Sequence, residues 1–187
     1  MTLPHSRVAE LDERVDKYFA GWRGNDLADR VFYTASALGD FGLIWVVLAL
    51  LRMLRGRPND DRAAVRAIVA TGVESVVVNA GMKSIFQRGR PVGLIEHPYP
   101  FRQPLTSSFP SGHATAAFCA ATLLADGDNL GPAYFAIAAV VAVSRVHVQI
   151  HHASDVVGGA VIGVALGGIG RAISPLPTPS LKRRSGR

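Results

Sequence analysis

Residues 144–155 read SRVHVQIHHASD and lie between two apolar runs of the chain. His151 and Asp155 are four residues apart, so on a helix they share one face. At that spacing a carboxylate can hold one imidazole nitrogen while the other nitrogen faces a substrate. Arg145 adds a fixed positive charge suited to an oxyanion. Taken alone, the cluster would equally fit a buried polar network between membrane helices.

Apolar runs dominate the chain, which has 187 residues of which 49% are hydrophobic. The runs cover residues 31–54, 63–86, 112–125, 130–143 and 153–173. Since about 20 apolar residues cross a bilayer core, we expect an all-α integral membrane protein with a bundle of about five transmembrane helices, the third being short. Gly159, Gly163 and Gly167 recur at every fourth position of the last run. This pattern is typical of a close-packing helix face in lipid.

The N-terminal segment has a different pattern. Its apolar residues recur every three or four positions among charged ones: Val8, Leu11, Val15, Phe19 and Trp22. The periodicity predicts an amphipathic helix that lies on the membrane surface or packs over the bundle. We therefore expect an amphipathic N-terminal segment (1–30), a transmembrane domain (31–173) and a basic, disordered tail (174–187).

The net charge of +6 does not indicate nucleic-acid binding, because the basic residues flank the apolar runs instead of forming one patch. They are modestly enriched around residues 52–66 and in the tail, and lysine and arginine collect on the cytoplasmic side of membranes. This bias predicts a cell-membrane protein whose residues 144–155 face the extracytoplasmic side. A sixth crossing at the N-terminus would move the first helix without moving that segment.

Two further polar motifs lie at the ends of apolar runs. The segment KSIFQRGRP (83–91) closes the second run, and PSGH (110–113) opens the third. If the helices alternate in direction, both motifs and residues 144–155 emerge on the same membrane face. Residues distant in sequence thus converge, as a functional site requires. The three motifs read K-x6-R-P, P-S-G-H and S-R-x5-H-x3-D, in that order.

This ordered set of motifs resembles the signature of the type 2 phosphatidic acid phosphatase superfamily, which includes bacterial lipid phosphate phosphatases, glucose-6-phosphatase and vanadium haloperoxidases. The resemblance covers residues 83–155. It implies a membrane phosphatase that acts on a lipid phosphate or diphosphate, such as polyprenyl diphosphate, phosphatidylglycerophosphate or phosphatidic acid. Six spans are usual in the membrane branch, whereas here the amphipathic helix replaces the first.

The motif residues suit phosphoryl transfer, which depends on positioning and charge neutralisation. Lys83, Arg90 and Arg145 supply three cations for one phosphate. Ser111 and Gly112 place the N–H groups of a helix N-terminus against the anion. Arg52, Arg55 and Arg88 are interpreted instead as flanking residues whose side chains reach the membrane surface.

The resemblance also implies catalytic roles. His151 would be the nucleophile and form a phosphohistidine, while Asp155 would fix its tautomer. His113 would protonate the leaving alkoxide and then deprotonate water. No cofactor or metal is expected, because the three cations neutralise the phosphate. The expected partners are a lipid phosphate substrate and membrane lipids, and the oligomeric state stays open.

Three competing interpretations remain. His147, His151 and His152 could bind a metal ion, although the family uses these positions differently. A soluble haloperoxidase is disfavoured by the five apolar runs. A non-catalytic or transport-type membrane protein of the same fold would be expected to lack at least one motif residue, and none is lacking.

Overall fold

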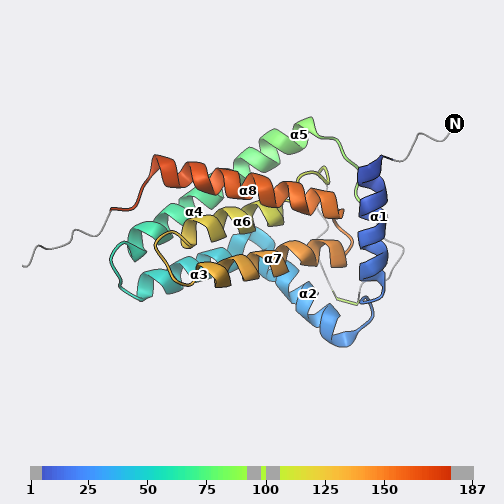
Figure 1. Ribbon diagram of the computed structural model, residues 1–187, viewed down its shortest axis with the longest axis horizontal. Helices are drawn as coiled ribbons and strands as arrows, with labels where there is room; N and C mark the ends of the chain where they lie inside the picture. Colours follow the sequence, from blue (N-terminus) through green and yellow to red (C-terminus); the bar gives the residue numbers. More distant parts are fainter. Residues whose placement is uncertain (1–5, 92–97, 100–105, 178–187) are drawn as a thin grey trace, which may run out of the picture.

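The computed structural model describes residues 6–91, 98–99 and 106–177, and every regular element in these ranges is helical. The order is α1 (Arg7–Ala20), α2 (Asp26–Gly39), η1 (Asp40–Gly42), α3 (Leu43–Leu54), α4 (Asp60–Val76), the π-helical η2 (Val77–Met82), α5 (Lys83–Ile85), α6 (Gly112–Leu124), α7 (Gly131–His147) and α8 (Ala153–Ile173). Helices α3, α4, α6, α7 and α8 run along the long axis, and α1 lies across one end (Figure 1). The predicted all-α bundle is confirmed.

The core of the bundle is built around α6, which contacts α4, α7 and α8. Its alanines Ala114, Ala117, Ala120 and Ala121 are fully buried. Small side chains let helix backbones approach closely, which is how helices associate in lipid. The residues at the two ends of α6 are therefore held in tight register with their neighbours.

The glycine stripe of α8 faces α6, as its spacing predicts. A Cβ atom on Gly159 would lie 2.7 Å from the carbonyl oxygen of Ser111, and one on Gly167 would lie 2.7 Å from Cβ of Thr122. Such approaches are shorter than van der Waals contact, so only glycine fits at these positions. The close packing brings the start of α6 beside the start of α8, where Ser111 N donates a hydrogen bond to the carbonyl of Asp155 (3.1 Å).

Within the part of the chain that the structure describes, three helical segments are long and apolar enough to cross a membrane: Asp26–Leu54, Asp60–Ile85 and Ala153–Ile173. The remaining apolar helices are shorter, with 13 residues in α6 and 17 in α7. At about 1.5 Å per residue, α6 extends only about 20 Å, against about 30 Å of hydrocarbon. If its C-terminal end lies at one membrane face, its N-terminal end is recessed below the other.

The first long segment begins earlier than expected and is broken near its middle. The Asn25 side chain caps α2 by accepting hydrogen bonds from the N–H groups of Leu27 and Ala28 (both 3.1 Å), so the expected boundary at residue 30 falls inside a helix. The segment is interrupted at Asp40, because α2 ends at Gly39 and η1 begins with Asp40. Phe41 has φ of 56° in this kink, a conformation rare outside glycine.

The interpretation of Arg52 and Arg55 as surface-reaching side chains is also wrong. Arg52 is 2% exposed and pairs with Asp60 (Nε–Oδ1 2.9 Å), while its other nitrogens donate to the carbonyls of Leu124 and Asp126. Arg55 pairs with Asp128 in the turn between α6 and α7. Arg52 thus satisfies carbonyls at and just after the end of α6, at the end of the bundle opposite the motifs. The part of the predicted basic tail beyond residue 177 lies outside the described residues.

The predicted amphipathic helix is α1. Its residues Val15 and Phe19 pack against a small cluster formed by Ala142 and Val146 of α7. Leu11 of α1 and Trp22, in the turn after the helix, stay exposed, at 57% and 49%. This distribution suits a helix with one side on the bundle and apolar side chains left for the membrane interface.

Candidate active site

The three motifs meet at one end of the bundle. Lys83 directly follows the π-helical η2, a type of turn that is frequent at functional sites. Its Nζ lies 3.5 Å from the position that a Cβ on Gly112 would take, at the start of α6. Arg145 lies near the end of α7, His151 in the turn after it, and Asp155 in the first turn of α8. The structure thus brings together residues that span 73 positions of the sequence, from 83 to 155.

The Arg145 side chain is buried with part of its hydrogen-bonding capacity unused. It is 1% exposed, and its NH1 group donates to the hydroxyl of Ser36 on α2. Its Nε and NH2 atoms have no partner among the described residues. Buried guanidinium donors without acceptors are costly, so an anionic ligand is the natural complement of this site.

The start of α6 supplies the second half of an anion site. Ser111 caps the helix, with its hydroxyl accepting from the N–H of Ala114 (3.5 Å). The first N–H groups of α6 therefore open on the same region as Lys83, which is itself only 8% exposed and lies 3.5 Å from Oγ1 of Thr106. A helix N-terminus beside a buried ammonium group favours a bound anion.

His151 is 3% exposed, and its two ring nitrogens face different groups. Its Nε2 lies 3.4 Å from NH1 of Arg90. Its Nδ1 lies 3.8 Å from Oδ2 of Asp155, too long for a direct hydrogen bond, and 3.5 Å from Oγ of Ser108. Because the Ser108 hydroxyl also donates to Asp155 Oδ2 (2.5 Å), it lies between the two. Ser108 was missed by sequence reasoning; its place just before the PSGH motif was the only signal.

The environment of His151 favours the neutral imidazole. Burial lowers the pKa of His151 to about 3; the Asp155 carboxylate acts in the opposite direction, and the nearby cations Arg145 and Arg90 lower the pKa further. A neutral ring with its Nδ1 side toward a carboxylate keeps the Nε2 lone pair available. Such a nitrogen can attack an electrophile.

Arg90 is held mainly by backbone carbonyls. Its guanidinium donates to the carbonyl oxygens of Thr106 (Nε 3.1 Å, NH2 2.9 Å), Ser107 (3.2 Å) and Ile150 (2.9 Å). It therefore fastens the segment before α6 to the turn before His151. Its charge still lies beside the histidine, with NH1 3.4 Å from Nε2 of His151.

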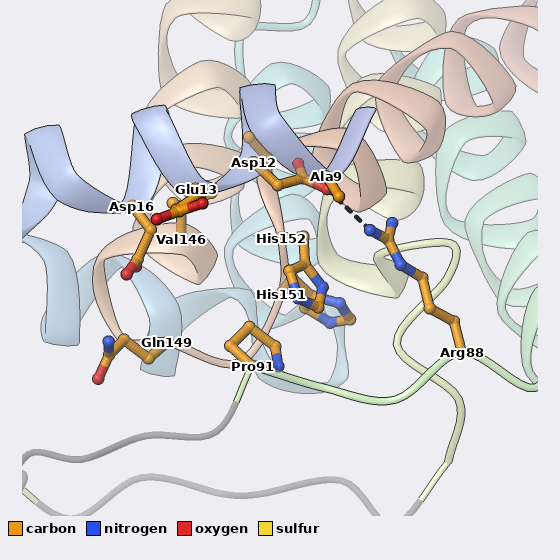
Figure 2. Close-up of a pocket in the computed structure, with 11 residues that line it drawn as sticks. Ala9, Asp12, Glu13, Asp16, Arg88, Pro91, Val146, Gln149, His151 and His152 are labelled. Carbon is orange, nitrogen blue, oxygen red and sulfur yellow. Dashed lines mark hydrogen bonds and ion pairs between the residues drawn. The ribbon is translucent and has the colours of Figure 1, made fainter. Parts of the chain in front are cut away.

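Arg88 is part of the site, and its interpretation as a flanking side chain is wrong. It pairs with Oδ1 of Asp155 (2.5 Å) and with Oδ2 of Asp12 on α1 (2.7 Å), and it donates to the Ser154 hydroxyl (2.7 Å). Asp12 in turn accepts from the N–H of Ser154 (2.8 Å). Figure 2 shows Arg88 reaching α1 at the edge of a cavity of about 280 Å³ that His151 and His152 also line. The only signal for Asp12 was an acid on the polar side of the amphipathic helix.

His113 has a carboxylate partner that sequence reasoning did not identify. Its Nε2 lies 3.1 Å from Oδ1 of Asp40 in the kink between α2 and α3, and 3.2 Å from the carbonyl oxygen of Ser36. The available signal was a charged residue that interrupts a long apolar run. In lipid such a residue marks a functional site more often than a structural one.

The metal-binding interpretation receives no support from the geometry. His147 points its Nε2 at Asp29 of α2 (2.7 Å) and packs its ring on Phe32, with centroids 4.6 Å apart. His151 and His152 both face Asp155. Within the described ranges, no group of three or more histidine, cysteine, aspartate or glutamate side chains is placed to hold a metal ion.

Comparison with known proteins agrees with the motifs. Residues 63–176 match the family model of the PAP2 superfamily. A decaprenylphosphoryl-5-phosphoribose phosphatase from Mycobacterium tuberculosis is 32% identical over 154 residues, which cover 76% of this chain and 81% of the relative. The chain spans only 46% of a longer curated relative that is 30% identical to it.

Two crystal structures have a similar fold. LpxE from Aquifex aeolicus superposes with a TM-score of 0.70 at 26% identity, covering 91% of this chain and 99% of that one. A transmembrane PAP2-type phosphatidylglycerolphosphate phosphatase from Bacillus subtilis superposes with a TM-score of 0.69 at 23% identity, covering 90% and 87%. The chain is therefore a multi-pass membrane protein that belongs to the PAP2 superfamily.

Proposed function

We propose that the chain is an integral membrane phosphatase that hydrolyses the phosphomonoester or diphosphate of a lipid. The observation that carries the proposal is the buried Arg145 guanidinium, whose Nε and NH2 groups lack a partner among the described residues. It lies in the same region as Lys83, the α6 N-terminus and the imidazole of His151. A phosphate group would satisfy these donors and neutralise the cations at once.

The proposed reaction has two steps. Nε2 of His151 attacks phosphorus, the bond from phosphorus to the leaving oxygen breaks, and His113 gives that oxygen a proton. Water then attacks the phosphorus atom of the phosphohistidine and gives a proton to His113. The phosphorus–nitrogen bond breaks, so inorganic phosphate is released and neutral His151 is regenerated. Asp155, through Ser108, orients the His151 ring and offsets the positive charge that it acquires. Lys83, Arg90 and Arg145 take the electrostatic role, so we propose that no metal ion is needed.

The short α6 supports a lipid substrate. Its N-terminal end lies up to about 10 Å below the membrane surface if its other end reaches the opposite face. A lipid phosphate whose apolar chains lie in the bilayer can approach this recessed position from within the membrane, whereas a water-soluble phosphate ester would have to leave the aqueous phase. The mycobacterial relative is named for a polyprenyl-linked phosphosugar, which supports the same substrate class. Candidates are polyprenyl diphosphate, phosphatidylglycerophosphate and phosphatidic acid.

Purified protein in detergent tests the proposal. Wild type should release inorganic phosphate from at least one of these lipids with EDTA present, and vanadate should inhibit competitively because it mimics the five-coordinate transition state. His151→Ala should fold and be inactive. Radiolabelled substrate should leave a base-stable, acid-labile phosphoryl group on wild type alone. An active His151→Ala variant would disprove the phosphohistidine step, and loss of activity on chelation would restore the metal interpretation.

The charge bias further suggests a site on the extracytoplasmic face of the cell membrane. The turn at residues 55–59 and the C-terminal end of α8 lie at the end of the bundle opposite the site. We propose that this opposite end is cytoplasmic, as the positive-inside rule predicts.

A further inference from the structure

A carboxylate lies where the longest apolar segment is broken. Asp40 begins η1, and the following residue, Phe41, has φ of 56° although it is not glycine. An ionisable side chain within a membrane span and a strained backbone each cost free energy, and both cluster at functional sites. We therefore expect the kink to have a function that a continuous helix could not perform.

The kink directs two acceptors at one atom. Oδ1 of Asp40 (3.1 Å) and the carbonyl oxygen of Ser36 (3.2 Å) both face Nε2 of His113. Neither a carboxylate nor a carbonyl can donate, so Nε2 carries a proton in both ionisation states of the ring. The exchangeable proton of His113 is consequently at Nδ1. Gly39 makes room for this arrangement, since a Cβ there would lie 2.7 Å from Cδ2 of the imidazole.

The charges around His113 explain why a carboxylate is needed. Arg145 of α7 is joined to the same Ser36 through its hydroxyl, and Lys83 lies next to Gly112, the residue before His113. Both cations oppose a positive charge on the imidazole. A general acid must nevertheless hold a proton when the leaving oxygen departs. Asp40 is the anion that faces the ring and offsets these cations.

We infer that Asp40 is a positioning residue for His113, which holds the ring with Nε2 protonated so that Nδ1 is the atom that exchanges a proton with substrate. The inference rests on the proposed function. In the first step the phosphorus–oxygen bond breaks and the leaving oxygen takes the proton from Nδ1, leaving neutral His113. In the second step Nδ1 removes a proton from the attacking water. Asp40 keeps its charge and its hydrogen bond to Nε2 throughout.

Aryl phosphates of graded leaving ability test the inference. Asp40→Asn removes the charge, and its amide can also present a donor to Nε2 and reverse the tautomer. We expect kcat/KM for phenyl phosphate to fall about 100-fold, within the range that general acid catalysis contributes. We expect little change for 4-nitrophenyl phosphate, whose leaving oxygen needs no proton. Because kcat/KM ends at bond cleavage, it isolates the step in which His113 is the acid.

Asp29→Asn is the matched control. Asp29 is on α2, which directly precedes η1, and pairs with a different histidine, His147, at 2.7 Å. Its loss should lower the melting temperature while the ratio of the two kcat/KM values stays at the wild-type level. Vanadate should still raise the melting temperature of Asp40→Asn, because the phosphate site is intact. A uniform loss on both aryl phosphates, or none, would overturn the inference.

Two further outcomes are decisive. If wild type releases no phosphate from any lipid or aryl phosphate, the proposed function is wrong, and the inference, which depends on it, is wrong as well. If wild type is active but Asp40→Asn does not fold, nitrogen NMR of ¹⁵N-histidine-labelled wild type decides, with His113→Gln used to assign the signal. Protonated Nε2 in neutral His113 supports the inference, and protonated Nδ1 refutes it.

Discussion

The packing of α8 on α6 makes a quantitative prediction about Gly163. A Cβ on Gly163 would lie 3.0 Å from both Cys119 N and Phe118 Cβ, and nearer still to the carbonyl oxygen of Thr115. Gly168, five positions along the same helix, has nothing within 4 Å of its Cβ position. Gly163→Ala and Gly168→Ala thus make the same chemical change with and without a steric conflict.

The magnitude follows from this difference. Atoms in ordinary contact are about 3.5–4.0 Å apart, so Gly163→Ala requires the helices to separate by roughly 0.5–1 Å. Overpacking of this kind costs about 1–3 kcal/mol. Each variant also gains up to about 1 kcal/mol in helix propensity, which cancels when the two are compared. At about 2–4 °C per kcal/mol for a chain of this size, Gly163→Ala should melt roughly 2–12 °C below Gly168→Ala.

The sole cysteine provides the assay. Cys119 is 1% exposed and lies on α6 against Gly163, so a thiol-reactive fluorophore in detergent reports when α6 and α8 part. Gly163→Ala should also lose about 100-fold in activity, because a displacement of about 1 Å between catalytic groups has that effect. Gly168→Ala should keep its activity. A Gly163→Ala protein that melts at or above Gly168→Ala would refute the close-packing argument.

Three other predictions follow from the site. Arg88→Ala leaves two carboxylates buried without their cation, so the free energy of unfolding should drop by about 3–5 kcal/mol. Arg88→Lys should recover part of this stability in the same melting assay. Wild-type stability in Arg88→Ala would contradict the pairing. The pKa of His151 lies well below that of an unfolded histidine, so the unfolded chain binds a proton that the native state does not. The melting temperature should therefore fall as pH drops below about 6.5, less so in His151→Gln, whereas kcat/KM should show no acid limb near 6.5 from this residue. In a Cys119→Ser background, a membrane-impermeant thiol reagent on intact cells should label Asp26→Cys but not Arg57→Cys, and the reverse pattern would place the site on the cytoplasmic face.

Much of the architecture could be predicted from patterns with one physical cause. The ends of successive helices alternate between the two faces of a bundle, so motifs at the proper ends of apolar runs must meet. That reasoning predicts that Lys83, His113 and Arg145 lie together. The glycine spacing on α8 likewise predicted its contact with α6, since a residue every fourth position forms a single helix face.

The partners of the motif residues could not be predicted in this way. Asp12, Asp40 and Ser108 carry no motif of their own, and their roles depend on how far α1 tilts and where the first long segment bends. Neither angle is encoded in a local pattern. The same holds for Arg52, which looked like a residue at a helix end but lies against the last carbonyls of another helix. Helix ends next to lipid need such donors, so an arginine there has two equally plausible uses.

Three of the four histidine–aspartate pairs within the described residues show why residue type alone does not define a catalytic group. His147 and Asp29 form the shortest of these pairs (2.7 Å), and the His147 ring packs among Phe19, Phe32 and Tyr33. The His113–Asp40 and His151–Asp155 pairs are longer, at 3.1 Å and 3.8 Å, and both face the region of the buried, incompletely paired Arg145. A short hydrogen bond stabilises a fold wherever it occurs. An imidazole can act as an acid or a nucleophile on a phosphate only where nearby cations still have unused hydrogen-bond donors that can bind that anion.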